Sequence, residues 1–396
     1  MGTSAWWRTR RWRVVGALAI TETVSWGVLY YAFAVFLAPM ERDLGASPAE
    51  LTGAYSLSLL ITSVAGVGVG RYLDRHGPRA LMTAGSIGGV ACVLAWSRVD
   101  GLLGFYVVWA LAGMAMAAVL YEPAFTVLAK WFPEPGERRR AITALTLVAA
   151  VSSFVFLPLS QALIDAHGWR TALVVLAAIL GVVTVPLHAL VLRAAPAPAQ
   201  APGEAPQPSV PAGEALRTAP FWMLTSAFFV AMAAAVALAV QGIPFLRERG
   251  YGAGFAAFAI GVIGISQIPG RLLFAPLAAR LSAPVSTATS FALVALGLVA
   301  LVAVDATAAV IAGMALVGMG NGMALLARAT VLADRYGPAA YGAIAGVAGA
   351  VNTGARAVAP VGAAAWAGVV GYPAMLMTLA AGAVAATVLA YAAERR

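Results

Sequence analysis

Apolar residues fall in twelve long runs that are separated by short polar turns. A helix needs about 20 apolar residues to cross the ~30 Å hydrocarbon core of a membrane, and each run comes near this length. The pattern predicts an all-α membrane protein with twelve transmembrane helices, six on each side of a polar gap. The predicted spans are residues 14–38, 51–71, 80–97, 102–129, 141–164, 171–192, 220–246, 253–279, 283–303, 306–332, 341–367 and 371–392.

The polar gap runs from Arg193 to Thr218 and contains six prolines between Pro196 and Pro211. Such sequence does not hold a helix and has few apolar side chains to bury, so we interpret it as a linker. The sequence TVLA occurs before it, at 126–129, and again after it, at 330–333. These repeats predict two related halves. We expect pseudo-symmetric six-helix bundles at 1–193 and 219–396, joined by a cytoplasmic linker at 194–218.

The composition supports a multi-pass membrane protein, because 62% of the residues are hydrophobic and only 10% are charged. Soluble proteins carry roughly 25% charged residues. With the N-terminus inside, seventeen basic residues lie near the cytoplasmic ends of the spans and five near the outer ends. This asymmetry predicts cytoplasmic N- and C-termini and accounts for most of the net charge of +9, so no basic patch is left for nucleic acid. Twenty-four arginines against one lysine are typical of a GC-rich bacterial genome, and we expect the inner or plasma membrane of a bacterium.

The sequence offers little for catalysis. Cys92 is the one cysteine, and the three histidines are too scattered for a metal site. No nucleotide-binding loop or nucleophile triad occurs, which predicts neither an enzyme nor a cofactor. Transport would then be driven by a gradient, through alternating access of the two halves around a site near the middle of the membrane.

Five ionisable residues fall inside the predicted spans: Glu22, Glu122, Arg271, Arg328 and Arg356. Each costs roughly 2.5–3.5 kcal/mol at the centre of a membrane helix, so such residues normally face a partner or a water-filled cavity. Two acids cannot neutralise three arginines, and the surplus positive charge suits an anion. A planar guanidinium binds a carboxylate through two parallel hydrogen bonds.

We therefore expect Arg271, Arg328 and Arg356 to bind the substrate. The alternative for each is a structural ion pair, which for Arg328 would be a gate salt bridge to Glu122. Glu22 and Glu122 are either counter-ions of these arginines or carriers of a proton. Four further polar residues are candidate hydrogen-bonding partners of the substrate, although polar residues also bridge packed helices. They are Gln241, Gln267, Asn321 and Asn352.

A charged corner follows the second predicted span. Within the stretch 70–79, Gly70 allows close helix packing, Asp74 is placed to cap or hydrogen-bond the start of a neighbouring helix, and Gly77 allows a tight turn. The stretch, which also holds Arg75 and Arg79, resembles the signature loop between helices 2 and 3 of the major facilitator superfamily. The resemblance implies a gate that latches the two halves together on the cytoplasmic side in the outward-open state. An ordinary basic turn is the alternative.

Other stretches resemble the monocarboxylate-transporter and oxalate/formate-antiporter branch of this superfamily. In span eight, Gln267 to Arg271 is similar to the substrate motif of that branch, with Gln in place of Asp. Arg356 lies close to where the oxalate/formate antiporters place a substrate-binding lysine, and Tyr30 begins a first-helix stretch of the branch. The stretch from Glu22 to Gly27 departs from the acidic motif of the branch by one additional residue. The similar stretches are 30–45, 120–125, 131–133, 138–141, 168–170 and 267–271.

The resemblance and the surplus of arginine imply a secondary carrier for a small organic anion, a mono- or dicarboxylate. Transport would occur by proton symport or anion exchange, with Tyr30 in the substrate site. The alternative of the same fold is an efflux pump for lipophilic, often cationic, compounds, with Glu22 and Glu122 as the binding acids. A transport-inactive membrane sensor is disfavoured, because no output domain accompanies the spans. The expected partners are the anion, protons and the lipid bilayer, and we expect a monomer.

Overall fold

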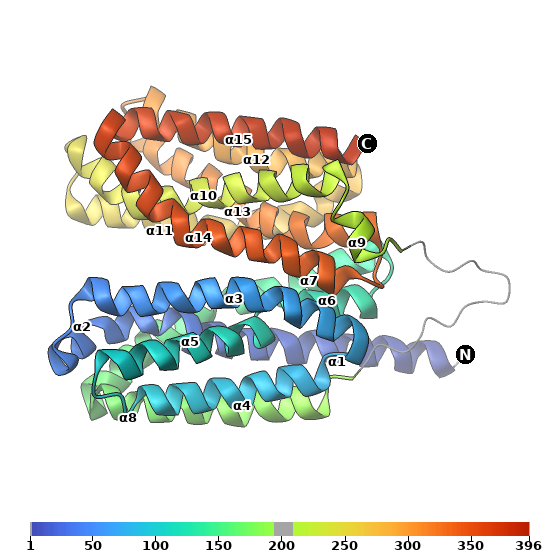
Figure 1. The fold of residues 1–396 in the computed structure, drawn as a ribbon. Coiled ribbons are helices and arrows are strands. Elements are labelled where there is room, and N and C mark those ends of the chain that lie inside the picture. The colour runs from blue at the N-terminus through green and yellow to red at the C-terminus, as the bar shows by residue number, and fades with distance from the viewer. Residues whose placement is uncertain (1, 194–208, 396) are drawn as a thin grey trace. The chain divides into compact units, whose positions relative to one another are not determined.

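The computed structural model describes residues 2–193 and 209–395, and within these ranges every regular element is a helix (Figure 1). The prediction of an all-α protein is confirmed. The first part of the chain contains α1 (Gly2–Ser25), the π-helix η1 (Trp26–Tyr31), α2 (Phe33–Leu44), α3 (Pro48–His76), α4 (Arg79–Trp96), α5 (Leu102–Val119), α6 (Tyr121–Trp131), α7 (Pro135–Ala149) and α8 (Ser152–Leu190). The second part contains α9 (Ala212–Ala215), α10 (Ala219–Glu248), α11 (Ala253–Arg280), α12 (Ala283–Ala303), α13 (Thr307–Tyr336), α14 (Tyr341–Val370) and α15 (Tyr372–Arg395).

Ten helical segments in the described residues are long and apolar enough to cross a membrane. One of them, 135–190, covers two of the predicted spans, and Gly168 interrupts its helical backbone with a φ of 76°. The helix α14 is 30 residues long but is not among the ten segments; it contains Asn352, Arg356 and Pro360. The number of crossing helices is therefore about ten to twelve.

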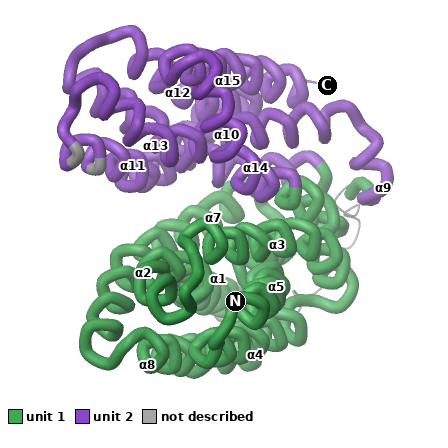
Figure 2. Tube along the Cα trace, turned by 60° about the vertical axis from the view of Figure 1, so that its left-hand side comes forward, with its two compact units in different colours: residues 1–210, 336–350 green, residues 211–335, 351–396 purple. Residues whose placement is uncertain are grey.

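The chain divides into two compact units (Figure 2). Unit 1 holds the described residues up to 210 together with 336–350, and unit 2 holds 211–335 and the described residues from 351 onward. The first ten residues of α14 therefore belong to unit 1 and the rest of this helix to unit 2. Most of the predicted linker lies outside the described residues. The short helix α9 begins directly after Pro211, the last proline of that stretch.

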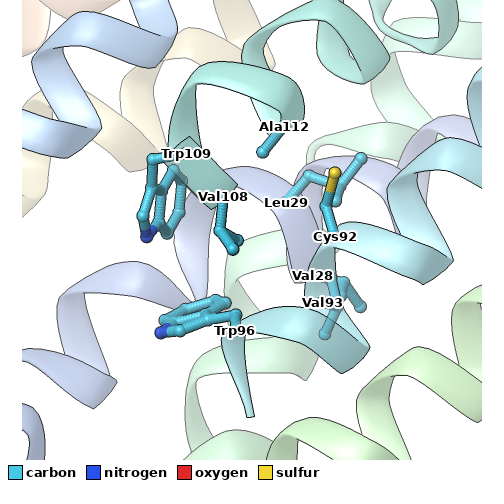
Figure 3. Close-up of a pocket in the computed structure, with 8 residues that line it drawn as sticks. All are labelled: Val28, Leu29, Cys92, Val93, Trp96, Val108, Trp109 and Ala112. Carbon is cyan, nitrogen blue, oxygen red and sulfur yellow. The ribbon is translucent and has the colours of Figure 1, made fainter. Parts of the chain in front are cut away.

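Unit 1 is built around pairs of long helices, notably α3 with α5 and α4 with α8. Its core contains Trp96 and Trp109, whose rings meet edge to face with centroids 4.9 Å apart. The indole nitrogen of Trp96 also donates a hydrogen bond of 3.0 Å to the sulfur of Met40. An apolar pocket lies beside the two tryptophans (Figure 3), and none of the predicted site residues lines it. Its lining residues are Val28, Leu29, Cys92, Val93, Trp96, Val108, Trp109 and Ala112.

Glycines determine how closely the helices of unit 2 approach one another. A Cβ atom at Gly318 or Gly322 of α13 would overlap the backbone of α11, and one at Gly320 would overlap the backbone of α12. Conversely, a Cβ at Gly270 of α11 would overlap the backbone of Met319. Small residues let membrane helices pack backbone to backbone. The glycines alternate along α13, so this helix packs against α11 on one face and against α12 on the other.

Candidate functional site

Three breaks in the helices of unit 1 lie near the residues predicted to function. The first span contains the π-helix η1, and the fourth is divided into α5 and α6 by Leu120, whose backbone is extended. The fifth predicted span, 141–164, is interrupted at Ala150 and Val151, which lie between α7 and α8. Breaks of this kind are frequent at functional sites of membrane helices.

The two acids predicted inside the membrane each lie next to one of these breaks. Glu22 lies one turn before η1, and Glu122 lies in the first turn of α6, where the positive end of the helix dipole favours a carboxylate. Sequence alone did not predict these breaks.

Glu22 is completely buried in unit 1. Its Oε2 atom accepts a hydrogen bond of 2.9 Å from the indole nitrogen of Trp26, and in the described residues its Oε1 atom has no hydrogen-bond partner. The carboxylate of Glu122 acts on it electrostatically. Glu122 itself lies against α14, because a Cβ added at Gly349 would come within 2.8 Å of its carboxyl carbon. The two acids therefore form one acidic region in unit 1.

An aromatic cluster lies beside the buried acid, which it contacts through Trp26. The ring of Trp26 has its centroid 4.8 Å from that of Tyr30, 6.1 Å from that of Tyr31 and 4.9 Å from that of Tyr121. Tyr55 of α3 joins through Tyr30 at 5.7 Å. All four tyrosines are partly exposed, whereas Trp26 is buried. We name Trp26, Tyr30, Tyr31, Tyr55 and Tyr121 the aromatic cluster.

The sequence pointed only to Tyr30 in the aromatic cluster. The spacing of Trp26 and Tyr30, four residues apart, was a readable signal, since residues at this spacing share one face of a helix. Tyr121 stands directly before Glu122, which was a second signal. Tyr55 comes from another span and carried no such signal.

Unit 2 holds all three of the arginines predicted inside the membrane. Arg271 is 7% exposed, and its Nη2 atom donates a hydrogen bond of 3.2 Å to the side-chain oxygen of Gln267. Arg328 is also buried, whereas Arg356 is partly exposed. The tight packing of α11 against α13 holds the helix that carries Gln267 and Arg271, because Gly322 leaves no space beside the backbone of Gln267.

The predicted amide residues are placed differently. Gln241 donates a weak hydrogen bond of 3.4 Å to the carbonyl of Pro360, so it bridges α10 and α14 in unit 2. Asn352 is buried, and its side-chain oxygen has no hydrogen-bond partner in the described residues. Asn321 is partly exposed on α13 between the glycines that contact α11. Gln267 contacts a predicted arginine, because its side-chain oxygen accepts the hydrogen bond from Arg271.

The ionisable residues predicted inside the membrane are divided by charge between the units: both acids lie in unit 1 and the three arginines in unit 2.

The described residues contain no group of three or more His, Cys, Asp or Glu side chains that could hold a metal ion.

The charged corner after α3 lies in unit 1 and is built around Asp74. Its carboxylate accepts hydrogen bonds from the backbone amides of Gly342, at 3.1 Å, and Ala343, at 2.7 Å, and forms a 3.0 Å ion pair with Lys130. The two amides belong to the first turn of α14, so Asp74 caps a neighbouring helix as its position in the sequence indicated. Its role in gating stays a prediction.

Of the other residues of this corner, Gly70 allows the close approach of α3 to α14. A Cβ at Gly70 would overlap the carbonyl of Gly342, and Gly77 has a φ of 78° in the turn to α4. About two turns before Gly70 on α3, the hydroxyl of Ser63 donates a hydrogen bond of 2.5 Å to the carbonyl of Ala350. Arg75 and Arg79 are exposed.

Comparison with known proteins identifies the family of the chain. The family model of the Major Facilitator Superfamily matches residues 18–360. An oxalate:formate antiporter of Oxalobacter formigenes is 28% identical over 59% of this chain and 55% of that protein, and monocarboxylate transporter 13 of Bos taurus is 28% identical over 69% and 63%. An MFS-type efflux pump of Mycolicibacterium smegmatis is 27% identical over 66% and 62%. The matches thus span between about half and two thirds of the length of these relatives.

Solved structures share the fold. The human organic anion transporter MFSD10 has a TM-score of 0.76 at 14% identity, covering 96% of this chain and 99% of that one. The fucose:proton symporter FucP of E. coli has a TM-score of 0.73 at 15% identity, covering 95% and 98%. At such low identity these likenesses establish the fold alone. With the family model matching 18–360, the chain belongs to the Major Facilitator Superfamily, a family of membrane transporters rather than enzymes.

Proposed function

We propose that the protein is a secondary carrier for a small organic anion, a mono- or dicarboxylate, which it moves by alternating access. The observation that carries the proposal is the concentration of three arginines, Arg271, Arg328 and Arg356, in the long helices α11, α13 and α14 of unit 2. Cations inside a membrane are costly and mark substrate pathways. The relatives named for oxalate, formate and monocarboxylates agree with an anionic substrate.

Arg271 is the proposed principal ligand of the carboxylate. Its hydrogen bond to Gln267 fixes one nitrogen of the guanidinium, and the close packing of α11 on α13 limits movement of the backbone beneath it. A guanidinium held in this way loses less conformational entropy on binding than a mobile one. Arg356 is the proposed second cation for a dicarboxylate, and Arg328 is either a third or a partner of Glu122 in a gate.

Coupling is proposed to involve the acids of unit 1. Glu22 is buried, and in the described residues Trp26 is the hydrogen-bond donor to its carboxylate. A proton that binds the carboxylate therefore displaces few hydrogen bonds. Proton symport through Glu22 or Glu122 is one mode, and exchange of one anion for another is the second. We also propose that residues 1–193 and 219–396 form two six-helix bundles, with both termini in the cytoplasm of a bacterial cell.

An efflux pump for lipophilic cations is the second candidate function. The aromatic cluster beside Glu22 favours it, because aromatic faces attract cations and bury apolar surface. The relative named as an efflux pump is also similar over 66% of this chain. Against it stands the excess of arginine over acid in the membrane helices.

A thermal-shift screen of the purified protein distinguishes the two candidates, because a ligand that binds the native state raises its apparent stability by mass action. The panel contains oxalate, formate, lactate and larger monocarboxylates on one side and cationic dyes on the other. The carrier proposal expects a concentration-dependent rise in melting temperature with at least one carboxylate and none with the dyes. A rise with dyes alone would favour the efflux pump and overturn the proposal.

A further inference from the structure

A hollow of about 290 Å³ opens in unit 1 where α3 ends. Its walls are the turn formed by residues 73–78 and the end of α6, with Val127, Lys130 and Trp131. This volume is at the lower end of the range for ligand sites, so it suits a small ion or a headgroup. The hollow contains none of the residues proposed to bind the transported anion.

Positive charge dominates the hollow. Arg75 and Lys130 line it, and Asp74 is the one acid among its lining residues. Both carboxylate oxygens of Asp74 are already occupied, by the amides of Gly342 and Ala343 and by the ammonium of Lys130. The acid is therefore neutralised by groups of the protein, and the remaining charge of the hollow is positive.

Both cations retain donors for a ligand. The Lys130 ammonium has three N–H groups, of which one is directed to Asp74 and one to the carbonyl of Leu73, both at 3.0 Å. Arg75 is exposed, and no contact of its guanidinium is recorded among the described residues. His76 stacks on the ring of Tyr72 at 4.5 Å, which holds the imidazole at the rim.

We propose that this hollow binds a phosphate-bearing anion. A phosphate group presents three acceptor oxygens, which suit the several N–H donors of Arg75 and Lys130, whereas a carboxylate presents two. The ligand is either the headgroup of an anionic phospholipid or a soluble phosphate compound. Because the ligand contacts Lys130, it competes with Asp74 for the ammonium. Binding therefore alters the charge around Asp74 and the hydrogen bonds that Asp74 accepts from the first turn of α14.

The test uses the purified full-length protein and two probes. The first probe is inorganic phosphate or glycerol phosphate added to the protein in detergent, with sodium chloride at matched ionic strength as the salt control. The second probe is reconstitution in phosphatidylcholine bilayers, with or without an equimolar amount of phosphatidylglycerol. Melting temperature is measured for the wild type, Arg75→Gln, Arg75→Lys and the control Arg71→Gln. Arg71 is exposed on the same helix but does not line the hollow, so its variant loses the same charge.

We expect at least one probe to raise the melting temperature of the wild type and of Arg71→Gln. Arg75→Gln should need about tenfold more of the probe, since a hydrogen bond to a charged group is worth ~1.5–3 kcal/mol, and Arg75→Lys should retain part of the affinity. A response to soluble phosphate identifies a free phosphate compound, and a response to phosphatidylglycerol alone identifies a lipid. The proposal is overturned if neither probe acts, or if Arg75→Gln responds as Arg71→Gln does.

Discussion

Asp74 at the end of α3 accepts a 2.7 Å hydrogen bond from the backbone amide of Ala343 in the first turn of α14. The carboxylate thus satisfies a helix-terminal amide and interacts with the positive end of the helix. Lys130 holds the same carboxylate from the other side. Because α14 begins in unit 1 and continues into unit 2, this contact lies on a helix that both units share.

The first prediction is that Asp74→Asn slows transport without much change in substrate affinity. The amide keeps the shape of the side chain but loses the charge that interacts with Lys130 and with the start of α14. Michaelis constants and maximal rates of uptake decide the matter, and we expect the maximal rate to fall. An effect confined to the Michaelis constant would contradict a role in conformational exchange.

Gly70 provides a second test of the same corner. Gly70→Ala should lower both the maximal rate and the melting temperature, because the added Cβ would overlap the carbonyl of Gly342. Gly66→Ala is the matched control, since a Cβ at Gly66 meets no atom within 4 Å and alanine is favoured over glycine in a helix by about 1 kcal/mol. Equal behaviour of the two variants would show that the approach of α3 to α14 does not matter.

The π-helix in the first span leads to a third prediction. A Cβ at Gly27 would overlap the ring of Phe156, so Gly27→Ala should destabilise unit 1 by about 1–3 kcal/mol, as overpacking commonly does. Gly16→Ala, on α1 with open space around the site, is expected to leave the melting temperature unchanged or to raise it. Phe156→Leu in the Gly27→Ala background should restore part of the loss. Thermal unfolding in detergent measures all three, and a fully stable Gly27→Ala variant would refute the packing argument.

The fourth prediction concerns coupling. If Glu22 carries the driving proton, Glu22→Gln should retain exchange of substrate across the membrane but lose accumulation driven by a pH gradient, since the amide cannot release or bind a proton. The same comparison applies to Glu122→Gln. Counterflow and gradient-driven uptake in proteoliposomes separate the two activities. If both variants still accumulate substrate in response to external acid, proton symport through these acids is wrong.

Much of the helical architecture could be predicted from the sequence, because the lengths of apolar runs directly reflect the thickness of the membrane. The position of Asp74 beside a helix start could also be predicted, since an acidic residue between Gly70 and Gly77 at the end of a span is placed to accept hydrogen bonds from the first amides of a neighbouring helix. The breaks at η1 and Leu120 were not predicted. A run of apolar residues indicates that a segment lies in the membrane, but it does not indicate where the backbone hydrogen bonds of the helix are interrupted. For the break at Leu120, the nearby Pro123 was a signal in the sequence.

The candidate site was predicted only in part for a related reason. Gln267 and Arg271 lie four residues apart on one helix, so their contact could be foreseen from spacing alone. The aromatic cluster brings together η1, α3 and α6, and contacts between residues so distant in sequence have no periodic signal. The assignment of residues 336–350 to unit 1 is likewise a consequence of packing, chiefly of glycines Gly342 and Gly346 against α3.

The proposal that Arg271 binds the transported carboxylate is tested most directly by counterflow uptake of a radiolabelled carboxylate into proteoliposomes. The substrate is the carboxylate that stabilises the wild type in the thermal-shift screen. The assay compares the wild type, Arg271→Lys and Arg280→Lys, the last being the same substitution at an exposed position on the same helix.

We expect Arg280→Lys to transport as the wild type does. Arg271→Lys should fold normally but lose tenfold or more of its uptake at low substrate, because an ammonium cannot form the two parallel hydrogen bonds, each worth about 1.5–3 kcal/mol. Uptake by Arg271→Lys at the wild-type rate and affinity would contradict the account.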